Sequence, residues 1–292
     1  MFYVFNTLVK PILNYGSDVW GVNNIGRDTI DRVAYQFIKN VLGVKRSTST
    51  TMVLGESGVL PHSIDCKRNT VNFLNRIVHM DGTSLVRQVY DELYWLHVCG
   101  FPTWCSKVLD LVAEYKLDVN LSPFEFKKRS KEIIVNDFKR KWTQQVTDVV
   151  NNPILRTYCT FKFKFGMEPY LEKILEPNLR KALSRLRTSS HALRIETARH
   201  DTNVLPVDER LCKFCQVIED EEHFLIRFKM YTTERENMYN SLLSTGYDIR
   251  HLSDEEQFVF LLTHNDPHHL QKLSKFVDVC FNKRISNSNA FN

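Results

Sequence analysis

Apolar side chains recur along most of the chain at intervals of three and four residues, which is the periodicity of amphipathic α-helices. The stretch TIDRVAYQFIKNVL at 29–42 is the clearest example, and Gly43 follows it where a helix C-cap glycine belongs. Its predicted apolar stripe consists of Val33, Phe37, Ile38, Val41 and Leu42. Because the same spacing returns over 64–79 and twice within 84–118, the pattern predicts a mainly α protein.

Two later segments carry patterns of their own. A long amphipathic helix is expected over 124–150, and the residues NNP at 151–153 end it. The segment YCTFKFKF at 158–165 alternates aromatic and basic residues with the two-residue period of a strand. We therefore expect a short strand or an extended arm at 158–165, with helices resuming at Leu171.

Composition limits the class of protein further. The chain has 292 residues, of which 43% are hydrophobic, so it can fill a sizeable core and is not wholly disordered. Its longest apolar run has about five residues, whereas a membrane-spanning helix needs roughly 20. The chain begins without the basic residues of a secretory signal, so we expect an intracellular protein, in the nucleus or cytoplasm, with reduced cysteines.

Charge is distributed unevenly along the chain. The segment 121–200 holds 17 basic and 8 acidic side chains, whereas 201–260 holds 6 and 13. A polyanion would therefore meet the middle of the chain, where Arg and Lys can form charge-assisted hydrogen bonds to phosphates. The candidate phosphate contacts are Lys127, Lys128, Arg129, Lys131, Arg185, Arg187 and Arg194.

Aromatic side chains interleave with basic ones inside this segment. Phe161, Phe163 and Phe165 alternate with Lys162 and Lys164, an arrangement that can stack on unpaired bases and neutralise phosphates. The competing interpretation is a solvated helix face with aromatic residues in the core. Both interpretations stay open at the level of sequence.

Cys212, Cys215 and His223 form the sharpest local motif, C-x2-C-x7-H. The two-residue spacing lets both thiolates of a tight turn face one ion, and zinc prefers thiolate and imidazole ligands. A closed structural site needs a fourth ligand, which small knuckles place five residues after the histidine, at Phe228 here. The ligand set for zinc is therefore incomplete. The spacing selects no replacement among the other nearby donors, His200, Asp220, Glu221 and Glu222.

Two other interpretations of this motif remain. The cysteines can be small buried hydrophobes, with His223 packed on a helix. A catalytic zinc with a bound water would need a cleft and a general base, and no motif supplies them.

Catalytic motifs are otherwise missing from the sequence. It contains no glycine-rich phosphate loop, no G-x-S-x-G elbow, no H-E-x-x-H motif and no adjacent aspartate pair. Four consecutive carboxylates at 219–222 cannot all face one ion from a helix, so a solvated face or turn accounts for them better. We expect neither a Mg²⁺ site nor enzymatic activity from this chain alone.

Three separated blocks resemble the C-terminal portion of the reverse transcriptases, or RNA-directed DNA polymerases, of non-LTR (LINE-type) retrotransposons. The first block comprises LVKPILNYGSDVWG at 8–21, FIKNVLGVKRST at 37–48 and GESGVLPHSI at 55–64. The second is RTSSHALRIETARH at 187–200, and the third is RLCKFCQVIEDEEHFLIRFKMY at 210–231. Their order and separation match the family over most of 8–231.

The resemblance implies that the first block belongs to the thumb that follows the polymerase palm. It also implies that the third block is a CCHC-like zinc knuckle that contacts template RNA or target DNA. The sequence departs from the family at Phe228, where the family has cysteine, so the knuckle is degenerate. The family's catalytic aspartate pair, which holds Mg²⁺ in the palm, is absent, so the chain resembles a fragment that would need an upstream palm-containing chain.

We accordingly expect a thumb-like helical region over 1–120, a basic helical region over 121–205, a zinc-knuckle-like segment over 206–231 and C-terminal helices over 232–292. The expected function is binding of RNA or DNA by a reverse-transcriptase fragment of a mobile element. The alternative is a non-catalytic helical interaction module, or a nonfunctional remnant of the element, without useful affinity for nucleic acid.

Overall fold

The computed structural model describes 2–22, 24–201 and 203–290. Within these residues the protein is mainly helical, which confirms the predicted class, and its β pairing is limited to an isolated antiparallel bridge between Leu211 and Ile218. None of the described helices is both long and apolar enough to span a bilayer. The chain divides into two compact units. Unit 1 comprises Met1–Phe37 and Leu60–Trp142, and unit 2 comprises Ile38–Val59 and Thr143–Asn292.

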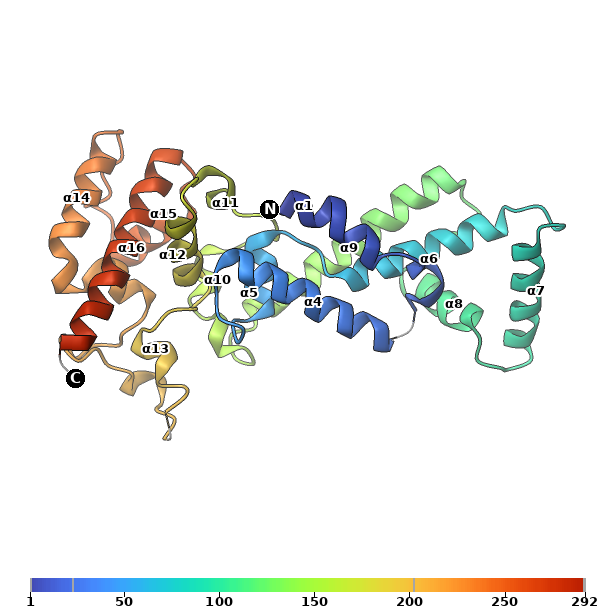
Figure 1. Ribbon diagram of the computed structural model, residues 1–292, viewed down its shortest axis with the longest axis horizontal. Coiled ribbons are helices and arrows are strands. Elements are labelled where there is room, and N and C mark those ends of the chain that lie inside the picture. Colours follow the sequence, from blue (N-terminus) through green and yellow to red (C-terminus); the bar gives the residue numbers. More distant parts are fainter. Residues whose placement is uncertain (1, 23, 202, 291–292) are drawn as a thin grey trace. The chain divides into compact units, whose positions relative to one another are not determined.

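Helices account for nearly all of the regular structure (Figure 1). Those of unit 1 are α1 (Phe2–Val4), the π-helical turn η1 (Phe5–Val9), α2 (Lys10–Leu13), α3 (Ser17–Trp20), α6 (His62–Val78), α7 (Leu85–Val98) and α8 (Trp104–Glu114). Those of unit 2 are α5 (Thr50–Ser57), α10 (Tyr158–Phe161), α11 (Tyr170–Lys173), α12 (Pro177–Arg187), α13 (Arg194–Thr197), α14 (Thr232–Leu243), α15 (Asp254–Thr263) and α16 (Pro267–Ala290). Unit 2 also contains the short turns η2 (Pro153–Leu155), η3 (Val207–Glu209), η4 (His223–Arg227) and η5 (Lys229–Tyr231). Two long helices, α4 (Asn24–Leu42) and α9 (Pro123–Thr147), begin in unit 1 and end in unit 2.

The core of unit 1 joins residues from both sides of the boundary expected near 120. One hydrophobic cluster consists of Ile64, Val71, Tyr115, Leu117, Phe126 and Ile134. Because Phe126 and Ile134 lie on the first half of α9, that half folds with the preceding helices and not with a separate basic region. The division in the structure therefore differs from the expected one and falls within α9, after Trp142.

Helix α4 confirms the helix predicted over 29–42, but the side of the helix that is buried is shifted by one position from the predicted apolar stripe. Ile38 is fully buried as expected, whereas Val33 is 54% exposed. The buried side includes Asp31, whose carboxylate accepts a hydrogen bond from the backbone N–H of His62 (2.6 Å). This carboxylate satisfies the first turn of α6, which has no side-chain cap of its own.

The expectation of a short strand or an extended arm at 158–165 is wrong for the first half of the segment, where Tyr158–Phe161 form the helix α10. Tyr158 and Phe161 lie three positions apart, and both are buried. Their rings meet edge-on with 5.4 Å between centroids. Burial of two rings on one side of a helical turn thus overrides the alternating pattern, as tertiary packing often does for short segments.

In unit 2 the C-terminal helix α16 packs against α12 and α14 (Figure 1). The buried side chains of α16 recur at helical spacing and are Leu270, Leu273, Phe276, Val277 and Cys280. Helix α12 contributes Leu183 and Leu186 to the buried residues of this unit. The chain that carries the candidate metal ligands runs between α12 and α14, so helices of the unit 2 core flank it at both ends.

Acidification is expected to destabilise unit 2 through His269, at the start of α16. The imidazole is fully buried, its Nε2 donates to the carbonyl of Leu261 (2.8 Å), and burial lowers its pKa from 6.5 to about 4. The unfolded chain binds this proton below pH 6.5, whereas the folded chain binds it only below about 4. The free energy of unfolding should therefore fall by about 3 kcal/mol as the pH drops through this window.

Urea unfolding followed by far-UV circular dichroism between pH 7 and pH 4 measures this effect. The control is His269→Gln, whose amide can still donate to the Leu261 carbonyl but does not titrate. The wild-type protein should lose more stability than the variant across the window. Parallel losses in the two proteins would assign the acid sensitivity to other groups.

Candidate metal centre

A tight turn at 210–219 carries both candidate cysteines. The backbone N–H of Cys212 donates to the carbonyl of Val217 (2.7 Å), next to the antiparallel bridge that pairs the two arms of the turn. Gln216 adopts the left-handed conformation, with φ 56°, in the returning arm. The C-x2-C segment is therefore folded back on itself within a short hairpin.

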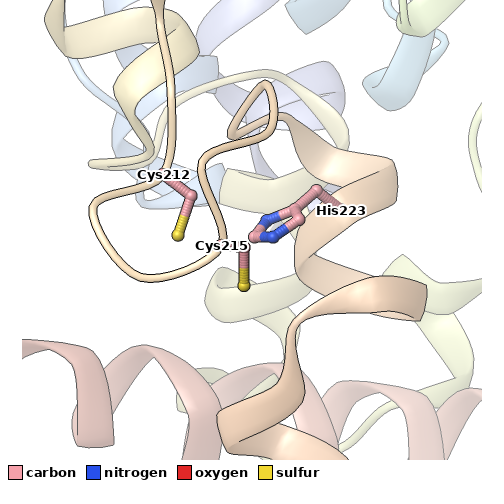
Figure 2. A group of neighbouring side chains, drawn as sticks. All are labelled: Cys212, Cys215 and His223. Carbon is pink, nitrogen blue, oxygen red and sulfur yellow. The ribbon is translucent and has the colours of Figure 1, made fainter.

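His223 joins the two cysteines from the next element. It begins η4, and its backbone N–H donates to the Asp220 carboxylate (2.8 Å), which fixes the start of that turn. The two Sγ atoms and a ring nitrogen of His223 lie within 4.8 Å of one another. Figure 2 shows the cysteines on the loop and His223 on the helical turn, with the three side chains around a common space. The structure thus brings together all three residues that the motif predicted.

The imidazole of His223 is in the state that a metal requires. The side chain is 2% exposed, and neither ring nitrogen has a hydrogen-bond partner among the described residues. Burial lowers the pKa of this imidazole, so the ring is neutral near pH 7. Buried polar groups are usually paired, so a nitrogen of this ring is available to a metal ion or to a water molecule.

The sulfur atoms are the second part of the donor set. Burial raises the pKa of the Cys212 thiol, and the backbone N–H groups of Phe214 and Cys215, which donate to its sulfur, offset only part of that rise. A metal ion would therefore have to displace the thiol proton, because the thiolate is the form that binds metals. Two thiolates and a neutral imidazole suit a borderline-soft divalent ion, whereas Mg²⁺ and Ca²⁺ take oxygen ligands.

An aromatic ring lies at the position of the missing fourth ligand. Phe228 is 4% exposed, and its ring centroid lies 5.3 Å from that of His223 and 4.7 Å from that of Tyr231. The backbone N–H of Phe228 donates to the carbonyl of His223 (2.8 Å), so the chain returns to the site as the knuckle spacing predicts. Among the described residues, the cluster of possible metal ligands consists of Cys212, Cys215 and His223. It does not include the other donors considered from the sequence, His200, Asp220, Glu221 and Glu222.

The acidic run 219–222 is not the solvated face or turn that the sequence suggested, because Glu219 and Glu221 are both buried. Although burial acts to raise the pKa of Glu221, a hydrogen bond from His191 Nε2 (3.0 Å) holds it well below its usual range. Glu219 pairs with Arg284 of α16 (2.6 Å). These two carboxylates therefore anchor the metal-ligand segment to the chain before it and to the last helix.

Four candidate phosphate contacts lie on α9 in unit 1 and are exposed, namely Lys127, Lys128, Arg129 and Lys131. Lys127 and Lys131 are four positions apart and share one side of the helix. Lys127 also lines a cavity of about 380 Å³ with Asn69, Asn72 and Arg76 of α6. Sequence reasoning missed these α6 residues, although their i, i+3, i+7 spacing marks a polar side of that helix.

The candidate role of Arg187 as a phosphate contact is wrong. Its side chain is 3% exposed, and the guanidinium pairs with Glu56 (2.7 Å) and Glu168 (2.7 Å) in unit 2. Burial alone acts to lower the pKa of Arg187, but the two carboxylates raise it overall. The charge is thus neutralised inside the core and does not face solvent.

Arg185 and Arg194 remain accessible to different degrees. Arg185 is exposed on α12 and donates to the carbonyl of Gly43 (2.8 Å). Arg194 is half-buried at the start of α13 and pairs with Asp201 (2.7 Å). Arg185 can therefore meet a polyanion directly, whereas Arg194 would first have to leave its carboxylate partner.

The interleaved residues at 161–165 do not form one stacking surface. Phe161 is buried, and so is Lys162, whose ammonium pairs with Glu168. Phe163 is 61% exposed, and Phe165 is half-buried. Phe163 is the member of the series that is available for stacking on a base.

The described residues thus offer two kinds of chemistry. Three soft or borderline ligands can hold a metal ion, and exposed basic side chains on α9 can bind phosphates. No family model matches the chain, and no similar protein was found among curated proteins or solved structures.

Proposed function

We propose that this chain is a nucleic-acid-binding protein that corresponds to the C-terminal portion of a LINE-type reverse transcriptase, with a degenerate zinc knuckle at 206–231. The observation that carries the proposal is the convergence of Cys212, Cys215 and His223, with both nitrogens of the buried histidine unpaired. Zinc bound to these residues would cross-link the 210–219 turn to η4 and stabilise the segment that contacts RNA or DNA.

The contacts between two of the resembling blocks support this proposal. His191 belongs to the block at 187–200 and Glu221 to the block at 210–231, and the two residues form a buried hydrogen bond of 3.0 Å. Ser189 Oγ donates to the same carboxylate (2.7 Å). The two blocks therefore fold as one piece of unit 2, as parts of a single binding module would.

The exposed basic residues of α9 supply the affinity in this proposal. Lys and Arg contacts to phosphates release counterions and require no particular base sequence. An upstream palm-containing chain would supply catalysis, because this chain lacks the adjacent aspartates that hold Mg²⁺. The chain alone would bind RNA or DNA without extending a primer.

Binding to single-stranded RNA and to duplex DNA is expected to weaken steeply with salt. Each phosphate that a basic side chain neutralises should contribute about 0.7 log units per log unit of salt for single strands, and about 0.9 for duplex DNA. Replacing both Lys127 and Lys131 with Gln should therefore lower the slope by about 1.4 for RNA. Fluorescence anisotropy across a salt series measures the slope, and metal analysis of the same sample gives the zinc content.

The matched control replaces two other lysines of unit 1, Lys107 and Lys116, with Gln and changes the net charge equally. This variant should keep most of the wild-type slope, because neither lysine belongs to the basic run of α9. An affinity that does not depend on salt, or an equal loss of slope in both double variants, would contradict the proposed contacts.

A non-catalytic interaction module is the second candidate function, and one feature of unit 1 favours it. Helix α7 exposes several large apolar side chains, including Leu85 (74%), Trp95 (61%) and Val98 (67%). Exposed apolar side chains gathered on one helix are more typical of protein contacts than of phosphate contacts. A folded sample with no affinity for RNA or DNA would favour this candidate.

A further inference from the structure

Besides the cavity beside Lys127 in unit 1, a polar cavity of about 380 Å³ lies in unit 2, and none of the three candidate metal ligands lines it. Two segments far apart in the sequence supply most of its wall, namely 45–48 after α4 and 188–200 after α12. Both segments fall within blocks that resemble the reverse-transcriptase family, yet the functions discussed above leave the cavity unused.

Hydrogen bonds hold these two segments together. Gly43 ends α4 with φ 68°, which confirms the predicted C-cap glycine, and Lys45 follows it. The backbone N–H of Lys45 donates to Ser190 Oγ (2.8 Å), and the Lys45 ammonium donates to the carbonyl of His191 (2.9 Å). The wall of the cavity is therefore fixed by specific contacts.

Thr48 carries a hydroxyl that no described residue satisfies. The side chain lines the cavity and is 6% exposed, and its Oγ1 has no hydrogen-bond partner. An unpaired buried hydroxyl is unfavourable unless a ligand or a water molecule pairs with it. Ser190 offers a second donor, because its oxygen accepts from Lys45 while the hydroxyl hydrogen can point to another acceptor.

The charges around the cavity favour an anion. The cations Lys45 and Arg199 line it, and the exposed imidazole of His200 adds an N–H donor. The acidic side chain among the described lining residues is Glu196, which is 7% exposed and pairs with Arg199 (3.2 Å) and Arg156 (3.5 Å). Its negative charge is therefore compensated by two arginines, which leaves Lys45 as an added positive charge in the wall. The hydroxyls of Thr188 and Ser189 already donate to the Ser184 carbonyl and to Glu221, so Thr48 and Ser190 supply the hydroxyls discussed above.

We propose that this cavity binds a phosphate group of a nucleic acid, an inference that rests on the nucleic-acid-binding function proposed above. Serine and threonine hydroxyls, with arginine and lysine, are the side chains that contact phosphate oxygens in nucleic-acid complexes. A volume of about 380 Å³ lies at the lower end of the range for small-ligand pockets, roughly 300 to 1,000 Å³. A free mononucleotide presents the same phosphate chemistry, so the test must separate the two sources.

The test compares the wild-type chain with Thr48→Val, which removes the unpaired hydroxyl and keeps the branched shape of the side chain. The probes are a labelled single-stranded RNA without terminal phosphates, followed by anisotropy, and AMP, followed by calorimetry. Thr48→Val should bind the RNA about tenfold more weakly, because one hydrogen bond to a charged oxygen is lost. Its urea midpoint should equal or exceed that of the wild type, which shows that the variant folds.

Two further variants make the result specific to the cavity. Thr245→Val is the matched control, because Thr245 is exposed and its hydroxyl donates to the carbonyl of Leu242. It should bind RNA as the wild type does. Lys45→Gln removes an exposed cation from the opening segment and should weaken binding independently of Thr48.

The outcomes separate this inference from the proposed function. Weaker RNA binding by Thr48→Val and Lys45→Gln, without AMP binding, supports the site and assigns it to the nucleic-acid backbone. AMP binding that Thr48→Val abolishes supports a phosphate site but assigns it to a free mononucleotide. Wild-type RNA affinity in both variants, without AMP binding, overturns the site and leaves the proposed function intact. If the wild type binds no RNA, the proposed function fails, and the absence of AMP binding then overturns the site as well.

Discussion

Replacing Arg187 with methionine is expected to lower the free energy of unfolding of unit 2 by about 3–5 kcal/mol. The guanidinium is 3% exposed and lies against Glu56, which is fully buried. Methionine fills a similar volume but leaves the Glu56 carboxylate without its cation in the core. The guanidinium also stacks over the rings of Phe161 (4.8 Å) and Tyr170 (5.4 Å), and these contacts would be lost too.

Denaturant unfolding followed by far-UV circular dichroism measures this loss. Tryptophan fluorescence is unsuitable, because all four tryptophans lie in the segments of unit 1. The matched control is Arg185→Met, two positions earlier on α12, where the exposed side chain makes a hydrogen bond to the Gly43 carbonyl. That variant should lose less than about 1 kcal/mol.

A double variant separates the buried charge from simple loss of packing. Adding Glu56→Gln to Arg187→Met removes the uncompensated carboxylate, so the double variant should be less destabilised than the sum of the two single variants. Equal stability losses for Arg185→Met and Arg187→Met would show that the buried ion pair is not what stabilises unit 2.

Replacing Phe228 with cysteine is expected to raise zinc affinity by about 100-fold. A structural zinc site with four ligands binds with roughly 10–16 kcal/mol, which is about 3 kcal/mol for each ligand. The ring of Phe228 lies beside the imidazole of His223, and the backbone already returns to the site there. A thiol at this position would therefore complete the set that Cys212, Cys215 and His223 begin.

Competition with a chelator measures the zinc affinity, and the absorption of the cobalt-substituted protein reports the number of thiolate ligands. Phe228→Ser is the matched control, because serine removes the same ring and adds a hydroxyl instead of a soft donor. Loss of the buried ring should destabilise both metal-free variants by about 3–5 kcal/mol. Only the cysteine variant should recover that stability on addition of zinc, and equal zinc binding by the two variants would contradict the assigned geometry.

The sequence was sufficient where local periodicity and local spacing decide the structure. The helix at 29–42, the left-handed Gly43 and the meeting of Cys212, Cys215 and His223 all depend on residues close together in the chain. Such features follow from helix geometry and turn chemistry alone. The fold class and the three ligands of the candidate metal centre were therefore predictable.

The errors arose where a distant partner decides the role of a side chain. The sequence predicts Arg187 to be a surface cation. In the structure its side chain is buried and pairs with Glu56, which lies 131 positions away in the chain. Glu221 is predicted to belong to a solvated acidic run, but in the structure His191 and Ser189 form hydrogen bonds with its carboxylate. A single sequence contains no signal for such pairings, because ion pairs in a core have no characteristic spacing.

Unit 2 consists of two separate stretches of the chain, which the ribosome synthesises at different times. The stretch Ile38–Val59 buries Met52 and Glu56 in a core whose other members follow Thr143. Glu56 emerges from the ribosome 131 residues before Arg187, a delay of about 7 to 26 s at translation rates of roughly 5–20 residues per second. During that interval the side chains of α5 lack the partners that later bury them, so slower elongation would lengthen the time for which they stay exposed.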